Sequence, residues 1–511
     1  MAQMSRRNFF AFASAGAVTA TMGLSASASA GTKIPAKWDE TVDVLIVGSG
    51  LAGMSAAVEA SAKKGTKIVV LEKMAMTGGN SMINAGAMGV AGTPMQEKKG
   101  IKDSPELFAE DMFREGLGLG DPAHVRTVAE KSLDAWLWTR NVLGVEWNEE
   151  TVVAEGGHTV ARGCITKSGT GATIVNKGLE LAKKQGVEVR TRCYVEEIIR
   201  EEGGRVLGLK VREGYRFPKA ESGKVKYIRA TKAVVLAHGG FGADVAYRTI
   251  HDPKLSKRFE STNQPGATGE MWRQASSIGC AIIQADWIQC GPWASPDEKG
   301  FGVGVGFAQD CCAMYGLWIN TTTGERFVNE LANRKVRADA IINLNNKNVE
   351  CIALADTNAY EVSIKVSRPG HLEKCLEKGV VTKYATLEDV AKKFNIPLES
   401  LKKQVAVYNE DVKKKAATDH MERIIQVGAK PLEQGPWYVS RLSPKVHHCM
   451  GGIRIDQEGR ALDVLTDKPI PGLFAAGEAS GGTHGAVRLG TCSITECIVH
   501  GRIAGQSIAK L

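Results

Sequence analysis

Three glycines and an acid near the N-terminus have the spacing of a dinucleotide-binding turn. Gly48, Gly50 and Gly53 form a G-x-G-x-x-G pattern, and Glu72 stands nineteen residues after the last of them. Glycines at these positions permit a tight turn and let the backbone approach a pyrophosphate, while the acid can accept hydrogen bonds from a ribose. An acid disfavours a phosphorylated ribose, so the pattern predicts NAD or FAD rather than NADP.

The residues around this turn predict the elements that would hold it. Residues 42–47 and 66–71 are largely apolar, which is typical of buried strands in a parallel sheet. Residues 54–60 between them are mostly good helix formers. Strand, turn, helix, strand and acid therefore follow in the order of a Rossmann unit, in which the pyrophosphate lies at the helix N-terminus.

Glycine-rich segments recur further along the chain. Residues 77–86 follow the second strand and could pass over a pyrophosphate towards a flavin ring. Residues 233–242 and 472–477 each resemble another strand that runs into glycine. The return of this pattern near the C-terminus predicts one site built from both ends of the chain.

Composition narrows the class of protein. With 511 residues, 43% of them hydrophobic and 24% charged, the chain has the make-up of an ordinary globular protein. The net charge of +9 is scattered rather than clustered, so we expect no nucleic-acid partner. The eleven cysteines include no C-x-x-C-H haem-attachment motif and no pair of C-x-x-C motifs for zinc, so we expect neither c-type haem nor a metal site.

The first thirty residues have the features of an export signal. Arg6 and Arg7 precede an uncharged stretch, and Ala28-Ser29-Ala30 supplies a cleavage site. A single membrane anchor is the alternative, but alanine and serine give little insertion energy. We therefore expect residues 1–30 to be a twin-arginine signal peptide, a periplasmic location and no stable membrane insertion.

Five motifs, taken together, resemble the soluble fumarate reductase flavoproteins, a family that includes flavocytochrome c fumarate reductases and urocanate and methacrylate reductases. In order, they are VGSGLAG with LEK and TGGNS, LAHGGFG, RFVNE with a later Arg, HHCMGG, and LFAAGEASGGTHGAVRLG. The resemblance runs from about residue 40 to the end. It implies an α/β fold with a discontinuous Rossmann-like FAD-binding domain, residues 41–289 and 441–511, and an inserted α+β capping domain, residues 290–440.

The resemblance also implies one non-covalent FAD per chain, with Glu72 on the adenosine ribose and Glu478 near the other ribose or the ribityl chain. Since we expect no haem in this chain, a separate periplasmic c-type cytochrome would donate the electrons. The residues expected to bind the cofactor are Gly48, Gly50, Leu51, Ala52, Gly53, Glu72, Lys73, Thr77, Gly78, Gly79, Asn80, Ser81, Ala85, Gly86, Val195, Ala237, Gly239, Gly240, Glu478, His484, Arg488, Gly490, Ser493 and Ile494.

The implied reaction is reduction of the C=C bond of an α,β-unsaturated carboxylate during anaerobic respiration. By resemblance, hydride comes from flavin N5 and Arg334 supplies the proton, although Arg334 could instead be a surface or carboxylate-clamping residue. An arginine has a pKa above about 12, so it can donate only if a nearby carboxylate reprotonates it, and Asp310 is the candidate. His447 (or, as second choice, His448) and Arg488 would hold the substrate carboxylate, beside Gly490 and Thr491.

The sequence departs from the family pattern at the positions where fumarate reductases bind a second carboxylate of the substrate. Gly291 and Trp293 replace a histidine and a threonine, Gln309 and Asp310 replace a Thr-Glu pair, and Ala313 replaces a basic residue. Gln309 could still bind a polar substituent. Loss of this receptor favours a monocarboxylate such as methacrylate, acrylate or an aryl acrylate over fumarate.

Two other functions stay open. A 3-ketosteroid-type flavin dehydrogenase would share the fold but use tyrosines for proton transfer. A non-catalytic electron-transfer flavoprotein would need no carboxylate receptor.

Overall fold

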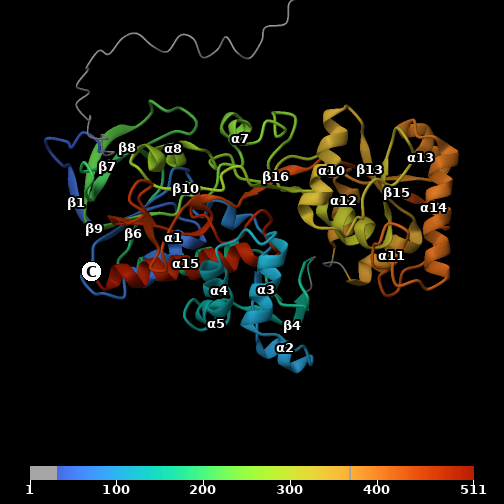
Figure 1. The fold of residues 1–511 in the computed structure, drawn as a ribbon, viewed down its shortest axis with the longest axis horizontal. Helices are drawn as coiled ribbons and strands as arrows, with labels where there is room; N and C mark the ends of the chain where they lie inside the picture. The colour runs from blue at the N-terminus through green and yellow to red at the C-terminus, as the bar shows by residue number, and fades with distance from the viewer. Residues whose placement is uncertain (1–30, 154, 156, 367–369) are drawn as a thin grey trace, which may run out of the picture.

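The computed structural model describes residues 31–153, 155, 157–366 and 370–511. The expected twin-arginine signal, residues 1–30, lies outside these ranges. Figure 1 shows two bodies side by side: one combines blue, green and red segments, and the other is yellow and orange. Every helix within the described ranges is too short or too polar to cross a lipid bilayer.

A sheet of eight strands organises the first body, and its central strands are parallel. The order is β18 (Arg460–Leu462), β19 (Pro469–Ala475), β9 (Lys224–Leu236), β1 (Glu40–Val47), β2 (Ile68–Leu71) and β6 (Glu188–Arg190), with β8 (Val206–Glu213) and β7 (Cys193–Arg200) continuing from β9. β1 is parallel to β2 and β9, and β9 is parallel to β19. Both ends of the chain therefore enter one sheet, which confirms the discontinuous Rossmann-like fold.

Two helices from opposite ends of the chain pack closely on this sheet. α1 (Leu51–Ala60) follows the glycine turn, and α15 (Cys492–Ala509) lies beside it, red in Figure 1. A Cβ atom on Gly501 would stand 2.4 Å from the carbonyl oxygen of Ala52, and one on Gly505 would stand 2.6 Å from that of Ala56. Glycine at these two positions allows the contact. The C-terminal helix thus fixes the helix that carries the glycine turn.

A smaller α+β layer extends from the first body. It contains the antiparallel strands β3, β5 and β4, in that order, with helices α2 to α5 beside them. Arg162, which is fully buried, ties this layer together by pairing with Asp103 and Asp111. Its elements are β3 (Ala87–Gly89), α2 (Pro94–Lys98), α3 (Pro105–Glu115), α4 (Pro122–Glu130), α5 (Ser132–Asn141), β4 (Trp147–Val153) and β5 (Gly163–Thr166).

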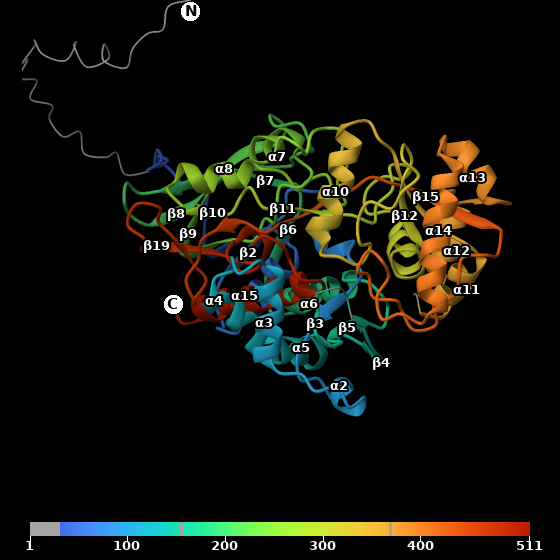
Figure 2. The ribbon, with the colours of Figure 1, turned by 45° about the vertical axis from the view of Figure 1, so that its right-hand side comes forward.

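The second body is the cap, and it has its own hydrophobic core between Trp293 and Leu442. Its antiparallel sheet has the order β12 (Leu317–Asn320), β13 (Cys351–Ala355), β15 (Trp437–Leu442) and β14 (Thr382–Tyr384). In Figures 1 and 2, α10 lies on the side facing the first body, while α14 lies on the far side. The helices of the cap are α10 (Arg334–Asn346), α11 (Thr357–Val366), α12 (His371–Glu377), α13 (Leu387–Phe394) and α14 (Leu398–Lys413).

An antiparallel pair of strands connects the two bodies. β11 (Ile288–Gly291) leads into the cap, and β16 (Lys445–Cys449) leads back. β15 extends to Leu442, two residues beyond the expected end of the cap. The remaining elements are α6 (Ala172–Lys184), α7 (Val245–His251), α8 (Glu270–Ser277), β10 (Ile282–Ile283), α9 (Val305–Phe307), β17 (Gly452–Ile453) and the short helical segments η2 (Gly79–Met82), η3 (Ala308–Ala313) and η4 (Gly477–Ala479).

Candidate active site

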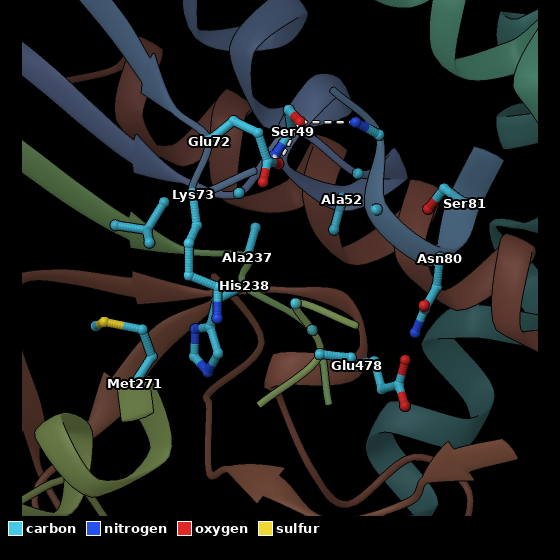
Figure 3. Close-up of a pocket in the computed structure, with 18 of the residues that line it drawn as sticks. Ser49, Ala52, Glu72, Lys73, Asn80, Ser81, Ala237, His238, Met271 and Glu478 are labelled. Carbon is cyan, nitrogen blue, oxygen red and sulfur yellow. Dashed lines mark hydrogen bonds between the residues drawn. The ribbon is translucent and has the colours of Figure 1, made fainter. Parts of the chain in front are cut away.

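A pocket opens at the carboxyl ends of β1, β2 and β9, where ligands bind in sheets of this kind (Figure 3). It comprises about 910 Å³ of space, part of which is open to solvent. Its walls come from the glycine turn, the loop after β2, the start of β7, the turn after β9 and the start of α8. Segments distant in sequence therefore meet around one cavity.

Glu72 fixes the glycine turn to the loop that follows β2. Its Oε2 atom accepts hydrogen bonds from Ser49 Oγ at 2.6 Å and Ser49 N at 3.3 Å, and its Oε1 atom accepts one from Met74 N at 2.9 Å. Ser49 Oγ in turn accepts a hydrogen bond from Gly78 N at 2.8 Å. The dashed lines in Figure 3 follow Ser49 between the two segments. Ser49 thus connects the glycine turn to the loop that follows β2 through hydrogen bonds.

The helix N-terminus at the turn is shaped for an anion. Gly48 has a φ of +104°, and a Cβ atom there would stand 2.3 Å from the carbonyl oxygen of Ala237, so only glycine fits. Gly50 precedes α1 and supplies no side-chain cap, and Leu51 N donates to Ser81 Oγ at 3.1 Å. The helix N-terminus at this turn is a place where backbone N–H groups can bind a phosphate. This geometry fits the pyrophosphate predicted from the sequence.

His238 gives a second indication that the pocket fits FAD. Both ring nitrogens of His238 are buried without a partner among the described residues, and the side chain lines the pocket. Burial, and then the charge of Lys73, lower the pKa of His238 to about 3, so the ring is neutral and can both donate and accept. Lys73 Nζ donates to Thr268 Oγ1 at 2.5 Å and lies 3.4 Å from Glu270. Polar groups of a bound dinucleotide would satisfy these buried atoms.

Glu478 lines the pocket on the side away from Glu72 (Figure 3). Its Oε1 atom accepts a hydrogen bond from Cys449 N at 2.9 Å and lies 3.5 Å from His448 Nδ1. Burial raises the pKa of Glu478 to about 7. A group in this position can bind a ribityl or ribose hydroxyl in either protonation state.

Most of the residues expected to bind the cofactor line this pocket. They are Gly48, Gly50, Leu51, Ala52, Glu72, Lys73, Gly78, Gly79, Asn80, Ser81, Val195, Ala237, Gly239, Gly240 and Glu478. Thr77, Ala85, His484, Arg488, Gly490, Ser493 and Ile494 do not line it. Gly53 and Gly86 do not line it either, because they pack against protein: a Cβ on Gly53 would meet the carbonyl oxygen of Gly48 at 2.0 Å, and one on Gly86 would meet Thr166 Oγ1 at 2.4 Å.

Several lining residues were missed from the sequence. Ser49 and His238 stand inside motifs that were recognised, Ser49 between two glycines and His238 directly before two, so their positions were a usable signal. Tyr194, Thr268 and Glu270 carry no such signal, because the packing of β7 and α8 against the sheet brings them to the pocket. The other missed lining residues are Val47, Leu71, Cys193, Gln264, Gly266, Ala267, Met271, Ala476 and Cys497.

Next to this pocket, His484 belongs to a buried group of histidines and an acid. Its Nε2 atom lies 3.2 Å from Glu496 Oε2, and His448, His484 and Glu496 place ligand atoms within 4.8 Å of one another. Burial alone would raise the pKa of Glu496, but the charge and hydrogen bond of His484 bring that pKa to about 2. The buried Glu496 carboxylate is thus held in its ionised form.

The residues expected to act on substrate gather around Trp293, between the cap and the first body. The Arg334 guanidinium stacks over the Trp293 ring at 4.8 Å, and the His447 ring meets it edge-on at 5.7 Å. Burial and then the charges of Arg488 and Arg334 lower the pKa of His447 well below its usual value, so this ring is neutral. His447 Nδ1 is hydrogen-bonded to Thr262 Oγ1 at 2.8 Å, which leaves Nε2 for a ligand.

Arg488 is buried, and not all of its N–H groups have hydrogen-bond partners among the described residues. Its Nη1 atom donates to the carbonyl oxygen of Leu489 at 3.2 Å, and its Nε atom has no partner among the described residues. Burial and then the charge of Arg334 lower the pKa of Arg488 to about 10, so it stays charged at neutral pH. Thr491 follows in a left-handed conformation, with a φ of +63°. His158 Nε2 lies 2.8 Å from the carbonyl oxygen of Gly490, which fixes this loop.

Trp293 fills the space that Gly291 leaves. A Cβ atom on Gly291 would stand 3.0 Å from Cζ2 of the Trp293 indole. A histidine at position 291 therefore could not be accommodated without displacement of the indole. The residues at the two positions that depart from the family pattern therefore occupy neighbouring space.

The expected contact between Asp310 and Arg334 is not found among the described residues. Asp310 lies 3.7 Å from His371 Nδ1, whereas Arg334 Nη2 donates to Glu155 Oε2 at 2.6 Å. Gln309 Oε1 accepts from Arg337 Nη1 at 2.8 Å. Adjacent residues of a helical segment point in different directions, so Gln309 faces α10 while Asp310 faces α12. Glu155 and Arg337 were not predicted to take part.

Comparisons with known proteins agree with this geometry. Residues 43–494 match the family described as FAD binding domain. The chain is 40% identical to an acrylate reductase flavoprotein subunit of Shewanella woodyi, and the match covers 98% of both chains. It is 33% identical to a urocanate reductase of Eggerthella lenta, over 92% of this chain and 75% of that one.

Solved structures show the same similarity at the level of the fold. The open conformation of a flavocytochrome c3 fumarate reductase superposes with a TM-score of 0.75 at 31% identity, over 93% of this chain and 79% of that one. A 3-ketosteroid dehydrogenase of Rhodococcus jostii has a TM-score of 0.74 at 22% identity, over 95% of this chain and 100% of that one, which shows a shared fold only. The chain therefore belongs to the FAD-binding oxidoreductase family that contains the acrylate, urocanate and fumarate reductase flavoproteins.

Proposed function

We propose that this protein reduces the C=C bond of small α,β-unsaturated monocarboxylates, and that acrylate-type acids are preferred to fumarate. The observation that carries the proposal is the cluster around Trp293. It brings together one carboxylate receptor, one proton donor and one apolar wall. The names of the relatives, which are reductases of acrylate, urocanate and fumarate, support the same reaction class.

Arg488 and His447 form the carboxylate receptor. The unpartnered Nε of Arg488 and the neutral ring of His447 can each donate a hydrogen bond to a carboxylate oxygen. A hydrogen bond orients each group: Arg488 donates to the carbonyl oxygen of Leu489, and His447 pairs with Thr262. They would also stabilise negative charge that moves onto the carboxylate as the double bond is attacked.

Bound FAD would supply the hydride to the β-carbon of the acid. Arg334 would supply the proton to the α-carbon, and stacking on Trp293 keeps its guanidinium in position for this. The buried indole also helps to exclude water from the reacting atoms.

A second carboxylate on the substrate would meet the Trp293 ring instead of a donor pair. A charged hydrogen bond contributes about 1.5–3 kcal/mol, which is roughly a tenfold to more than a hundredfold difference in affinity. We therefore expect kcat/KM for acrylate or methacrylate to exceed that for fumarate by at least about tenfold.

Three finer features belong to the same proposal. FAD is held without a covalent bond, as the family resemblance implies. A separate c-type cytochrome donates electrons, and the protein works in the periplasm after twin-arginine export. The last two features rest on the sequence motifs and on the family resemblance.

Steady-state kinetics test the proposal. The protein loaded with FAD is assayed with reduced methyl viologen and with acrylate, methacrylate, cinnamate, urocanate and fumarate at equal concentrations. We expect acrylate or methacrylate to give the highest kcat/KM. Fumarate as the best substrate by a clear margin would refute the assignment of substrate class, and no turnover with any acid would refute the reaction.

A further inference from the structure

Two arginines of the cap face two carboxylates of the first body. Arg334 and Arg337 lie in the first turn of α10, whereas Glu115 ends α3 and Glu155 follows β4. Arg334 Nη2 donates to Glu155 Oε2 at 2.6 Å, and Asn333 Nδ2 donates to Glu115 Oε1 at 2.8 Å. These contacts cross from one body to the other.

Glu155 lies between the proton donor and the carboxylate receptor. A Cβ atom on Gly490, two residues after Arg488, would stand 2.2 Å from Glu155 Oε2, so the carboxylate rests against the receptor loop. The side chain of Glu155 is 33% exposed, compared with 16% for Arg334. Glu155 is therefore in contact with Arg334 on one side and has access to water on the other.

No other described contact supplies Arg334 with a carboxylate. Asp310 faces His371, and Arg337 donates from Nη1 to Gln309 and to the carbonyl oxygen of Glu330. The Glu115 carboxylate accepts its hydrogen bond from Asn333 rather than from Arg334, and burial raises its pKa. Among the described residues, Glu155 alone combines direct contact with Arg334 and exposure to solvent.

We propose that Glu155 is the positioning residue that returns a proton to Arg334 after each turnover, which rests on the reductase function proposed above. As the hydride adds to the β-carbon, the electron pair of the C=C bond forms a C–H bond at the α-carbon with a proton from an Arg334 N–H group. The electron pair of that N–H bond stays on the neutral guanidine. Glu155 then takes a proton from water and passes it to the guanidine, so one hydride and one proton are added per C=C bond.

This proton supply depends on the position of the cap. Arg334 belongs to the cap and Glu155 to the first body, so the two groups meet only when α10 is seated against that body. A guanidinium has no free site for a further proton, so Arg334 can accept one only after it has given one to the substrate. Proton return is thus timed to follow proton transfer to the substrate.

Variants of the FAD-loaded protein test the proposal with acrylate and reduced methyl viologen. Glu155→Gln keeps the shape but cannot relay a proton, so we expect kcat to fall at least about a hundredfold while KM stays within about threefold. We also expect kcat of Glu155→Gln to rise as pH falls, because protons must then reach Arg334 directly from water. Glu155→Asp should recover at least about a tenth of the wild-type kcat.

The matched control is Glu149→Gln on β4, the strand that precedes Glu155. It removes a surface pair with Arg140 and should leave kcat unchanged. Asp310→Asn tests the competing carboxylate and should retain most of the activity. The proposal is overturned if Glu155→Gln turns over like the wild type, or if Asp310→Asn shows the loss and the new pH dependence instead. A wild-type protein that reduces no acid would overturn the reductase function and this proposal together, which separates that outcome from a failure of Glu155 alone.

Discussion

Replacement of Trp293 by alanine gives a sharp test of how the site selects its substrate. The indole is buried, with 5% of its surface exposed, and it stacks 4.8 Å from the Arg334 guanidinium. Loss of a cation–π contact costs about 0.5–2 kcal/mol, so kcat/KM for acrylate should fall by roughly twofold to thirtyfold.

The same change makes room without adding a donor. One methyl group in a fitted apolar pocket is worth about 1–3 kcal/mol, so the ratio of methacrylate to acrylate kcat/KM should rise by about tenfold or more. The ratio of fumarate to acrylate should stay within about threefold of the wild type, because the second carboxylate still meets no charged or hydrogen-bonding partner.

A double variant separates the effect of added volume in the site from the effect of an added hydrogen-bonding group. In Trp293→Ala/Gly291→His, the space opened by the first change can hold the new histidine, whose Cβ atom would otherwise stand 3.0 Å from the indole. The imidazole can bind a second carboxylate, so the fumarate to acrylate ratio should rise by about tenfold or more. Trp293→Phe, which keeps an apolar wall, is the control for fold and flavin content.

Steady-state kinetics with reduced methyl viologen measure all three ratios. If Trp293→Ala alone raises fumarate over acrylate by tenfold, a second carboxylate receptor already lies behind the indole. Trp293 would then exclude fumarate by its size alone, and the claim that the site lacks a second carboxylate receptor would be refuted.

Three further predictions concern the cofactor, the proton donor and pH. Gly50→Val should abolish FAD loading while the fold persists, since a side chain there enters the pyrophosphate path and would stand 3.2 Å from Ser81 Oγ. Circular dichroism measures the fold, and the flavin-to-protein absorbance ratio measures the loading. A fully loaded variant would contradict the prediction. Arg334→Ala should keep FAD and substrate binding but lower kcat by at least about a thousandfold; retention of a tenth of the turnover would place the proton donor elsewhere. Burial raises the pKa of Glu478 to about 7, so the free energy of unfolding of the protein without FAD should fall as pH rises from about 4.5 through 7, by about 3 kcal/mol in total. Urea unfolding at several pH values measures this fall, and Glu478→Gln should remove it.

The sequence predicted the part of the fold that depends on local pattern. The apolar runs at residues 42–47 and 66–71 correspond to the parallel strands β1 (Glu40–Val47) and β2 (Ile68–Leu71). The glycine turn that follows β1 lines the pocket because strand, glycine and helix are contiguous there. The sequence also showed that Gly291 and Trp293 depart from the family pattern, but their close approach is seen only in the structure.

The contacts that cross between bodies could not be predicted in the same way. Glu155, which follows β4, reaches Arg334 at the start of α10 only through the packing of the cap on the first body, and no local pattern around residue 155 marks it. Asp310 was expected at Arg334 from its position in a family motif, but a shift of one residue along a helical segment turns a side chain towards a different neighbour.

Reoxidation of the reduced flavin tests the central claim most directly. The FAD-loaded protein is reduced with dithionite under anaerobic conditions, and acrylate or fumarate is then added while flavin absorbance is followed. We predict rapid reoxidation by acrylate with one propionate formed per flavin, and reoxidation by fumarate at least about tenfold slower at equal concentration. Reoxidation by fumarate that is clearly faster than by acrylate would contradict the assigned substrate class, and no reoxidation by any unsaturated acid would contradict the reductase function itself.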